Sequence, residues 1–391
     1  MTVTARTYSG APFGGFLEKN CSPSTPSGNR CSEIGRSPLA RTKPSPTATR
    51  YRARSSLVMP RSGHSTRDGL EIRTSRSPSG PGTVSVVAGV AMQRNLLRRR
   101  EHGTDRDRTR QDGPVTAYLG VDLAWGLGTE RRAPNETGLA ALDGDGRVTD
   151  AGWARGVDEV TAWIAERLGP RTLIAVDASL VVTNPTGVRE AERQVGQRYG
   201  RWKVAANPTN LASAASAGAR MLDRLTALGV TYVSDTAAMR ARTVPAVFEC
   251  YPYTTLVGVE EFGYDDERPR YKRLDTSVPP AVARQRRAEA FDELVRRMRT
   301  TVFDPPLDLD AHPLTRDLRD PSVLHGPTHK HREDLLDGVL CAWTASFWER
   351  HGDERVQVLG GDPGLPSDPL DAQGRLPALV APARRTQRPA R

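Results

Sequence analysis

Residues 118–126 read YLGVDLAWG, a run of apolar and β-branched residues that carries one carboxylate, Asp122, near its end. The run is typical of a buried strand. A buried carboxylate without a partner destabilises the folded state, so a chain rarely keeps one there without a compensating interaction. The question that decides both fold and function is therefore what compensates Asp122.

The 391 residues divide into a basic N-terminal segment and a nearly neutral remainder. Residues 1–114 hold 20 of the 56 Lys and Arg residues and 8 of the 46 Asp and Glu residues, a net charge of +12, which leaves −2 for the rest. The composition of residues 1–112 (Ser, Thr, Pro, Gly and Arg) predicts disorder. A nucleic-acid-binding arm and a translation start further downstream, for instance at Met92, are the alternatives.

The remainder is expected to form one ordered domain over 115–361, followed by a disordered Pro- and Arg-rich tail over 362–391. The four cysteines are scattered and form no CxxC pair, which favours a reducing cytoplasm over an oxidising compartment. No apolar run reaches the ~18–20 residues of a membrane span, so we expect no membrane partner.

Within this domain, strands alternate with helices. A strand at 116–124 is followed by a hairpin over 137–154, and two further buried strands lie in RTLIAVDAS (171–179) and VPAVFECYP (244–252). RVQVLGG (355–361) predicts a short last strand. Helices are expected at 157–168, 188–200, 208–229, 280–300 and 332–350. The order predicts an α/β fold with a mixed sheet and helices on both faces.

Three of these strands each carry one acid near the carboxyl end: Asp122, Asp177 and Glu249. Ligands of open α/β sheets bind outside the carboxyl ends of the strands, so these acids are expected to share one site. Gly120 and Ala175 lie on the same strand faces as Asp122 and Asp177, and small residues there would leave room for a ligand.

The last helix adds Asp334 and Asp337, which are three residues apart and share one face. Acids in the first turns of a helix also suit its dipole, which is the structural alternative. Four or five carboxylates at one sheet edge would repel one another unless a cation neutralised them. Oxygen ligands without clustered Cys or His select Mg²⁺ or Mn²⁺, and two such ions would clamp a phosphodiester for attack by water.

Six segments resemble the domain-of-unknown-function family four-twenty-nine: GVDLAWG, TGLAAL, AVDASLVVTNPTGVREAERQ, FECYP, RPRYKR and HREDLLDGVLCAWTA. The resemblance covers roughly residues 116–360. The family is described as predicted nucleases of RNase H-like fold, which implies a five-stranded sheet with three antiparallel strands first.

On such a fold, Asp122 would be the acid of the first strand and Asp177 that of its neighbour. Asp334 or Asp337 would be the acid of the closing helix, and His331 with Asp334 resembles the His-x-x-Asp of RuvC-like resolvases. Ribonucleases H take a further Glu from the first helix. Here Glu249 is expected to replace it, while Glu159 and Glu166 on the predicted first helix are alternatives.

Cations flank the predicted acidic site and would hold a phosphate backbone. The residues expected to do so are Arg189, Arg193, Arg198, Arg201, Lys203, Arg270 and Lys272, with Arg268 and Arg273 in the same RPRYKR run. Tyr199, Trp202 or Tyr271 would stack a base. A solvated helix face with Glu–Arg pairs explains the same residues equally well.

The sequence thus predicts a metal-dependent nuclease with carboxylate-held Mg²⁺ or Mn²⁺, for which DNA and RNA remain equally open as substrates. A phosphotransferase of the actin and sugar-kinase kind is the second hypothesis, although the sequence lacks that class's second phosphate-binding turn and duplicated domain. A binding protein that keeps the fold without turnover is the third. It would be expected to have lost part of the acid set.

Overall fold

The computed structural model describes residues 117–387 except 130, 213–216 and 363. The prediction of disorder for 1–112, together with its two alternatives, lies outside these residues. In the described part, Cys250 and Cys341 are buried and carry free thiols.

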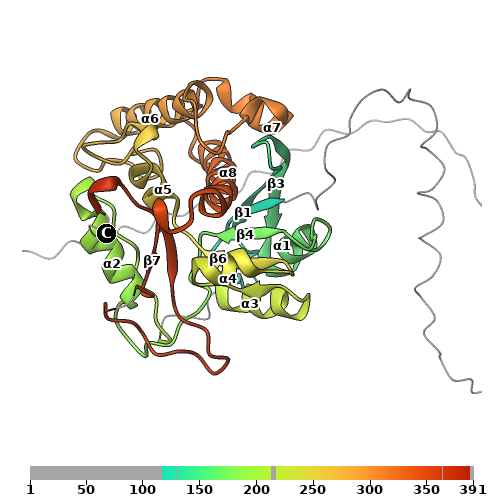
Figure 1. Cartoon of the computed structure of the whole chain (residues 1–391). Coiled ribbons are helices and arrows are strands. Elements are labelled where there is room, and N and C mark those ends of the chain that lie inside the picture. The colour runs from blue at the N-terminus through green and yellow to red at the C-terminus, as the bar shows by residue number, and fades with distance from the viewer. Residues whose placement is uncertain (1–116, 130, 213–216, 363, 388–391) are drawn as a thin grey trace, which may run out of the picture. The chain divides into compact units, whose positions relative to one another are not determined.

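The centre of the structure is a six-stranded mixed sheet in the order β3-β2-β1-β4-β6-β5 (Figure 1). Its strands are β1 (Tyr118–Asp122), β2 (Glu136–Leu142), β3 (Val148–Arg155), β4 (Leu173–Val176), β5 (Thr231–Tyr232) and β6 (Ala246–Glu249). The first three pair antiparallel, and β4, β5 and β6 continue the sheet in parallel with β1. The mixed α/β fold is confirmed. The predicted count of five strands misses β5, which is too short to show the alternation of apolar and polar residues that is typical of a strand.

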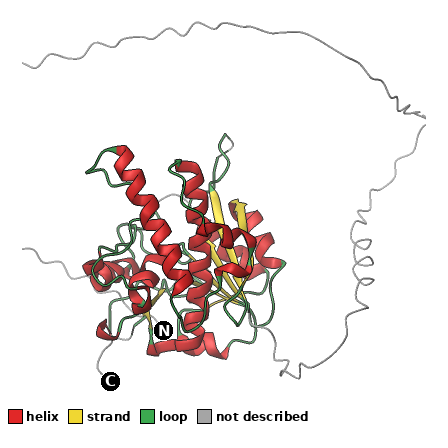
Figure 2. Ribbon diagram, turned by 90° about the horizontal axis from the view of Figure 1, so that it is seen from above, coloured by secondary structure: helices red, strands yellow, loops and turns green. Residues whose placement is uncertain are grey.

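Helices cover both faces of this sheet (Figure 2). One apolar cluster joins the sheet to α1 (Gly156–Ala165) and α3 (Ala217–Ala227). A second, larger cluster joins the opposite face to α8 (Gly326–His351). The other helices that contribute to the second cluster are α2 (Glu190–Tyr199), α4 (Thr236–Ala241), α5 (Pro252–Gly258) and α6 (Pro280–Thr300), while α7 (Pro313–Arg316) is a single turn.

Helix α8 lies directly on the sheet because glycines remove the side chains between them. A Cβ on Gly138 would be 1.7 Å from the carbonyl oxygen of Asp334, and one on Gly120 would be 2.0 Å from that of Gly338. The space beside Asp122 that Gly120 opens is therefore filled by the backbone of α8, not by a ligand. This close approach brings the acids of α8 to the end of β1.

The helix predicted over 208–229 is shorter in the structure, since only Ala217–Ala227 is helical among its described residues. The start of the segment is held in a non-helical conformation by the carboxylate of Glu192. Its oxygen accepts the backbone N–H of Thr209 at 2.9 Å. This long-range hydrogen bond leaves no periodic trace in the sequence.

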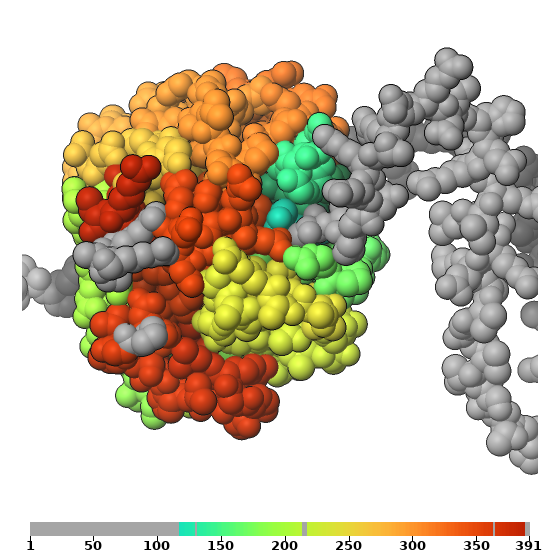
Figure 3. All heavy atoms as spheres, in the orientation of Figure 1, coloured from blue at the N-terminus to red at the C-terminus, as the bar shows by residue number. Residues whose placement is uncertain are grey.

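The prediction of disorder over 362–391 is wrong for the residues that the structure describes there. β7 (Val356–Leu359) pairs antiparallel with β8 (Leu379–Pro382), and all of β8 is buried. Arg384 then donates to the carbonyls of Val257 and Tyr264. Figure 3 shows the C-terminal segment (red) packed against the part of the chain that holds α4 (yellow). The Pro- and Arg-rich average composition hides a short apolar strand.

Candidate active site

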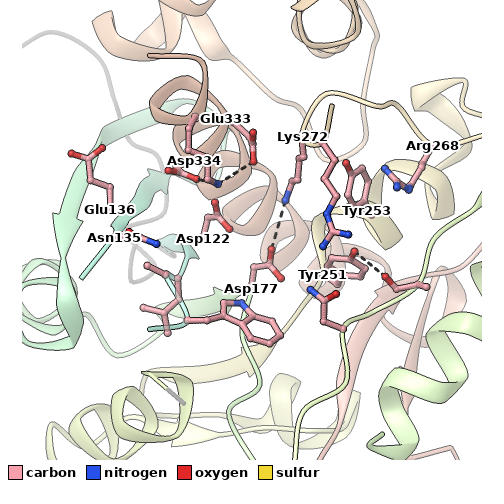
Figure 4. A pocket seen from close by; sticks show the side chains of 17 residues that line it. Asp122, Asn135, Glu136, Asp177, Tyr251, Tyr253, Arg268, Lys272, Glu333 and Asp334 are labelled. Carbon is pink, nitrogen blue, oxygen red and sulfur yellow. Dashed lines mark hydrogen bonds and ion pairs between the residues drawn. The ribbon is translucent and has the colours of Figure 1, made fainter. Parts of the chain in front are cut away.

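A cavity of about 320 Å³ opens at the carboxyl ends of β1 and β4 (Figure 4). Its acidic side is formed by Asp122 at the end of β1, Asp177 just after β4, and Glu333 and Asp334 in α8. Three of these acids were predicted from the sequence, and the fold does bring them together. Asp337 lies one turn further along α8 and is fully buried behind them.

Asp122 lies between Asp177 and Asp334 in this cluster (Figure 4). Burial, reinforced by the neighbouring Asp122 carboxylate, raises the pKa of Asp334 to about 8 and that of Asp177 well above its ordinary value. Burial and the same neighbour raise the pKa of Asp337 to about 7. The cluster therefore resists carrying all of its negative charges at once.

Two lysines partly neutralise the acids. The ammonium of Lys272 contacts Asp337 and lies 3.9 Å from Oδ2 of Asp177. The ammonium of Lys330 contacts Asp334 and lies 3.0 Å from Oε1 of Glu333. Both lysines keep their charge, since the adjacent carboxylates raise the pKa of each, and that of Lys272 despite its burial.

No group of three or more His, Cys, Asp or Glu side chains within the described residues is arranged so that it could hold a metal ion as it stands. The donor set of Asp122, Asp177 and Asp334 nevertheless fits a hard divalent cation by its chemistry. It offers only carboxylate oxygens, and burial together with the neighbouring Asp122 raises the pKa of Asp177 and Asp334, so a cation would stabilise their charged forms. Mg²⁺ and Mn²⁺ are the ions that such donors select.

Glu249, predicted as a metal ligand, does not line this cavity. Its Oε1 accepts from Nη2 of Arg189 at 2.5 Å, and its Oε2 accepts from Nη1 of Arg189 at 2.9 Å and from the backbone N–H of Leu180 at 3.1 Å. The strand register explains the placement. Glu249 follows Val247 on the face covered by α1 and α3, whereas Asp177 follows Ala175 on the face covered by α8.

His331 lies behind the rim of the cavity instead of at its mouth. Its ring stacks on Trp153 with the centroids 3.6 Å apart, and its Nδ1 is 2.8 Å from Oε2 of Glu136. Glu136 itself lines the cavity. His331 is thus connected to the cavity lining through the carboxylate of Glu136.

Of the seven cations predicted to bind substrate, Lys272 lines the cavity and the other six do not. Each of the six has another partner: Arg189 pairs with Glu249 and Glu192, Arg193 with Glu190, Arg198 with Asp362, both Lys203 and Arg270 with Glu267, and Arg201 lies over the ring of Trp202. The aromatic residues expected to stack bases, Tyr199, Trp202 and Tyr271, are buried in the core. Ion pairs and core packing therefore explain these residues better than substrate binding does.

Other residues take the places that those cations were expected to fill. Arg268 and Arg273 line the cavity on the side of Tyr251 and Tyr253, and the guanidinium of Arg268 lies 4.3 Å from the ring centroid of Tyr253. Trp125 lines the cavity as well and is 45% exposed. The sequence signal for the tyrosines was their position directly after the β6 strand, and for Trp125 its position three residues after Asp122.

Lys330 and Glu333 also escaped the sequence analysis. Both belong to α8 in the structure, but the helix predicted over 332–350 begins too late to include Lys330, which stands four residues before Asp334. That spacing is the usual signature of an ion pair along one helix face.

Comparisons with known proteins identify a family without assigning a function. No curated protein and no solved structure matches the chain. No helix in the described residues is long and apolar enough to cross a membrane. The model of a family described as protein of unknown function (DUF429) matches residues 120–363, which span the sheet, the acid cluster and α8. The resemblance seen in the sequence is thus confirmed, and the chain belongs to the DUF429 family.

Proposed function

We propose that the protein is a metal-dependent nuclease, which hydrolyses phosphodiester bonds of nucleic acid with Mg²⁺ or Mn²⁺ held by Asp122, Asp177 and Asp334. One observation carries the proposal. Asp122 lies between two other aspartates that come from different elements, and all three face one open cavity. Carboxylates that repel one another in this way are a ready site for a divalent cation.

The arrangement of the sheet supports an RNase H-like reading of the fold. Three antiparallel strands come first and parallel strands extend from β1, as the family resemblance implied. The acids occupy the end of β1, the end of its parallel neighbour β4, and the helix that covers both strands. Each of these positions agrees with the acid set expected for that fold.

The walls of the cavity suit a nucleotide. Arg268 stands across from Asp122 and Asp334 (Figure 4), Arg273 lines the same cavity, and both offer guanidinium groups to a phosphate. The indole of Trp125 offers an exposed ring on which a base can stack. Cations on one side and metal-binding acids on the other would hold a phosphodiester between them.

When bound, the metal ion would stabilise the negative charge that develops on the phosphate and supply a reactive water. The chain's own residues would orient the reaction. Arg268 and Arg273 bind the flanking phosphates, and Glu136, which is connected to His331, accepts or returns a proton at its Oε atoms. As the resemblance implies, the product is expected to carry a 5′-phosphate.

The test is a cleavage screen with the full chain on single-stranded, double-stranded and branched DNA and RNA, in Mg²⁺, Mn²⁺ or EDTA. Asp122→Asn should abolish cleavage. Asp158→Asn, a matched change at an exposed carboxylate of α1, should leave it unchanged. Cleavage that persists in Asp122→Asn would contradict the proposal. If no nucleic acid is cleaved but ATP is hydrolysed through Asp122, the phosphotransferase hypothesis replaces the nuclease.

A further inference from the structure

The acid cluster contains a cation of its own on the side of Asp177 and Asp337. In a site with two divalent ions, carboxylates such as these two would hold the second ion. Here the ammonium of Lys272 contacts Asp337 and lies 3.9 Å from Asp177. We propose that Lys272 takes the place of a second metal ion, so that the site binds a single divalent cation on Asp122, Asp177 and Asp334. This inference rests on the proposed function.

Lys272 is fixed in this position from several directions. Its side chain is 17% exposed, and its ammonium lies 5.2 Å from the ring centroid of Tyr253 and 5.8 Å from that of Tyr271. Both rings offer their faces to the cation. A lysine confined in this way is a permanent component of the site, because leaving would place Asp337 unpaired in the protein interior.

Lys330 differs from Lys272 in just this respect. Its side chain is 59% exposed, and it reaches Glu333 and Asp334 from solvent along the surface of α8. Releasing such a lysine into water costs little free energy, since exposed ion pairs contribute little to stability. An arriving metal ion can therefore displace Lys330 from Asp334, whereas it cannot readily displace Lys272 from Asp337.

Asp337 acts in this arrangement as the anchor of Lys272 and not as a metal ligand. The hydroxyl of Tyr271 donates to its Oδ1 at 2.6 Å, and Lys272 contacts its Oδ2. Both oxygens are thus engaged within the protein, and the side chain is fully buried. The choice between Asp334 and Asp337 that the sequence left open falls to Asp334 as the ligand, since Asp334 lines the cavity.

Charge also disfavours a second ion on the side of Asp177 and Asp337. A second divalent ion would have to bind within reach of the buried ammonium of Lys272, which repels it.

The test counts bound Mn²⁺ on the full chain, by the loss of the free-ion spectrum in electron paramagnetic resonance titrations. The wild-type protein should bind one ion. Lys272→Ala should bind two, because it frees Asp337 and leaves room for an ion with its water. Lys203→Ala, which removes a lysine that does not line the cavity, should still bind one.

Two ions on the wild-type protein, or only one on a folded Lys272→Ala variant, would overturn the inference and leave the proposed function intact. No bound ion on the wild-type protein would overturn both. Because Lys272→Ala leaves Asp337 unpaired, its folding is checked by circular dichroism, and the double variant Lys272→Ala/Asp337→Asn removes both charges. This variant should bind one ion within about tenfold of the wild-type affinity, about 1.4 kcal/mol. Loss of binding would identify Asp337 as a ligand and refute the inference.

Discussion

Two groups of buried acids lie near the same edge of the sheet, and they differ in how their charge is balanced. Glu249 shares Arg189 with Glu192, and its oxygens receive three hydrogen bonds from Arg189 and the backbone. Carboxylates outnumber cations in both groups, but the cluster around Asp122 and Asp334 faces an open cavity.

The difference shows that a strand-end position alone does not identify a functional acid. The side chains of Glu249 and Arg189 are 3% and 1% exposed and are paired with each other. Their pairing connects β6 to the loop before α2, which is a structural task. An acid without a matching internal cation, at an open cavity, is the better indicator of a binding site.

The largest effect that separates the two groups should be on activity. Asp122→Asn is expected to lower metal-dependent cleavage by on the order of 10³-fold, because removing a central ligand removes the charge stabilisation that the ion supplies. The melting temperature without metal should stay the same or rise, since one repelling charge is gone. Initial rates and thermal melts measure both effects, and a simultaneous loss of folding would make Asp122 structural, like Glu249.

Arg189→Met should mainly affect stability, in contrast to Asp122→Asn. It leaves Glu249 and Glu192 buried without their cation, which is expected to lower the free energy of unfolding by about 3–5 kcal/mol. Arg193→Met removes an arginine that pairs with Glu190 at 3.0 Å on the surface, and should cost less than about 1 kcal/mol. Urea unfolding measures these values. If Arg189→Met lowers the free energy of unfolding no more than Arg193→Met, the structural role of Arg189 and Glu249 is contradicted.

The contact between α8 and the sheet is tested by Gly138→Ala. The new Cβ would collide with the carbonyl oxygen of Asp334, so the helix must shift, and we expect a loss of about 1–3 kcal/mol together with weaker Mn²⁺ binding. Gly152→Ala in the neighbouring β3 meets nothing within 4 Å and should be nearly neutral. Equal effects of the two changes would show that the close approach does not position Asp334.

The last effect concerns pH. Asp334 and Asp337 have a pKa of about 8 and about 7 in the folded protein, above that of an unfolded Asp. The folded state therefore retains protons that the unfolded chain releases, and without metal its stability should fall as pH rises from about 4 to about 8. Asp334→Asn should make this fall smaller, and Mg²⁺ should flatten it. Urea unfolding at several pH values measures this dependence. If the unfolding free energy of Asp334→Asn depends on pH as that of the wild type does, the raised pKa of Asp334 is contradicted.

The convergence of Asp122, Asp177 and Asp334 could be predicted because it follows from local patterns. Two of these acids end apolar strands, and the third lies on an amphipathic helix. The failure with Glu249 was avoidable in part, since its parity with Val247 places it on the opposite face from Asp177. The pairing with Arg189, 60 residues away, carries no such local signal.

The role of Gly120 shows a different limit. A small residue beside an acid predicts free space equally well whether a ligand or another part of the chain fills it. The filling segment here is α8, more than 200 residues later in the sequence. Likewise, Lys272 was identified as one of several cations, but only the fold distinguishes it from Arg270, which pairs with Glu267 on the surface.

The position of α8 on the sheet also orders events in time during protein synthesis. Strands β1, β2 and β4 leave the ribosome long before residues 326–351 are made. One apolar face of the sheet therefore stays exposed until α8 has been synthesised. Contacts between segments so distant in sequence form slowly, and an exposed face of this kind invites aggregation. Since Asp334 arrives with that same helix, a nascent chain cannot assemble its acid cluster until most of the protein has been translated.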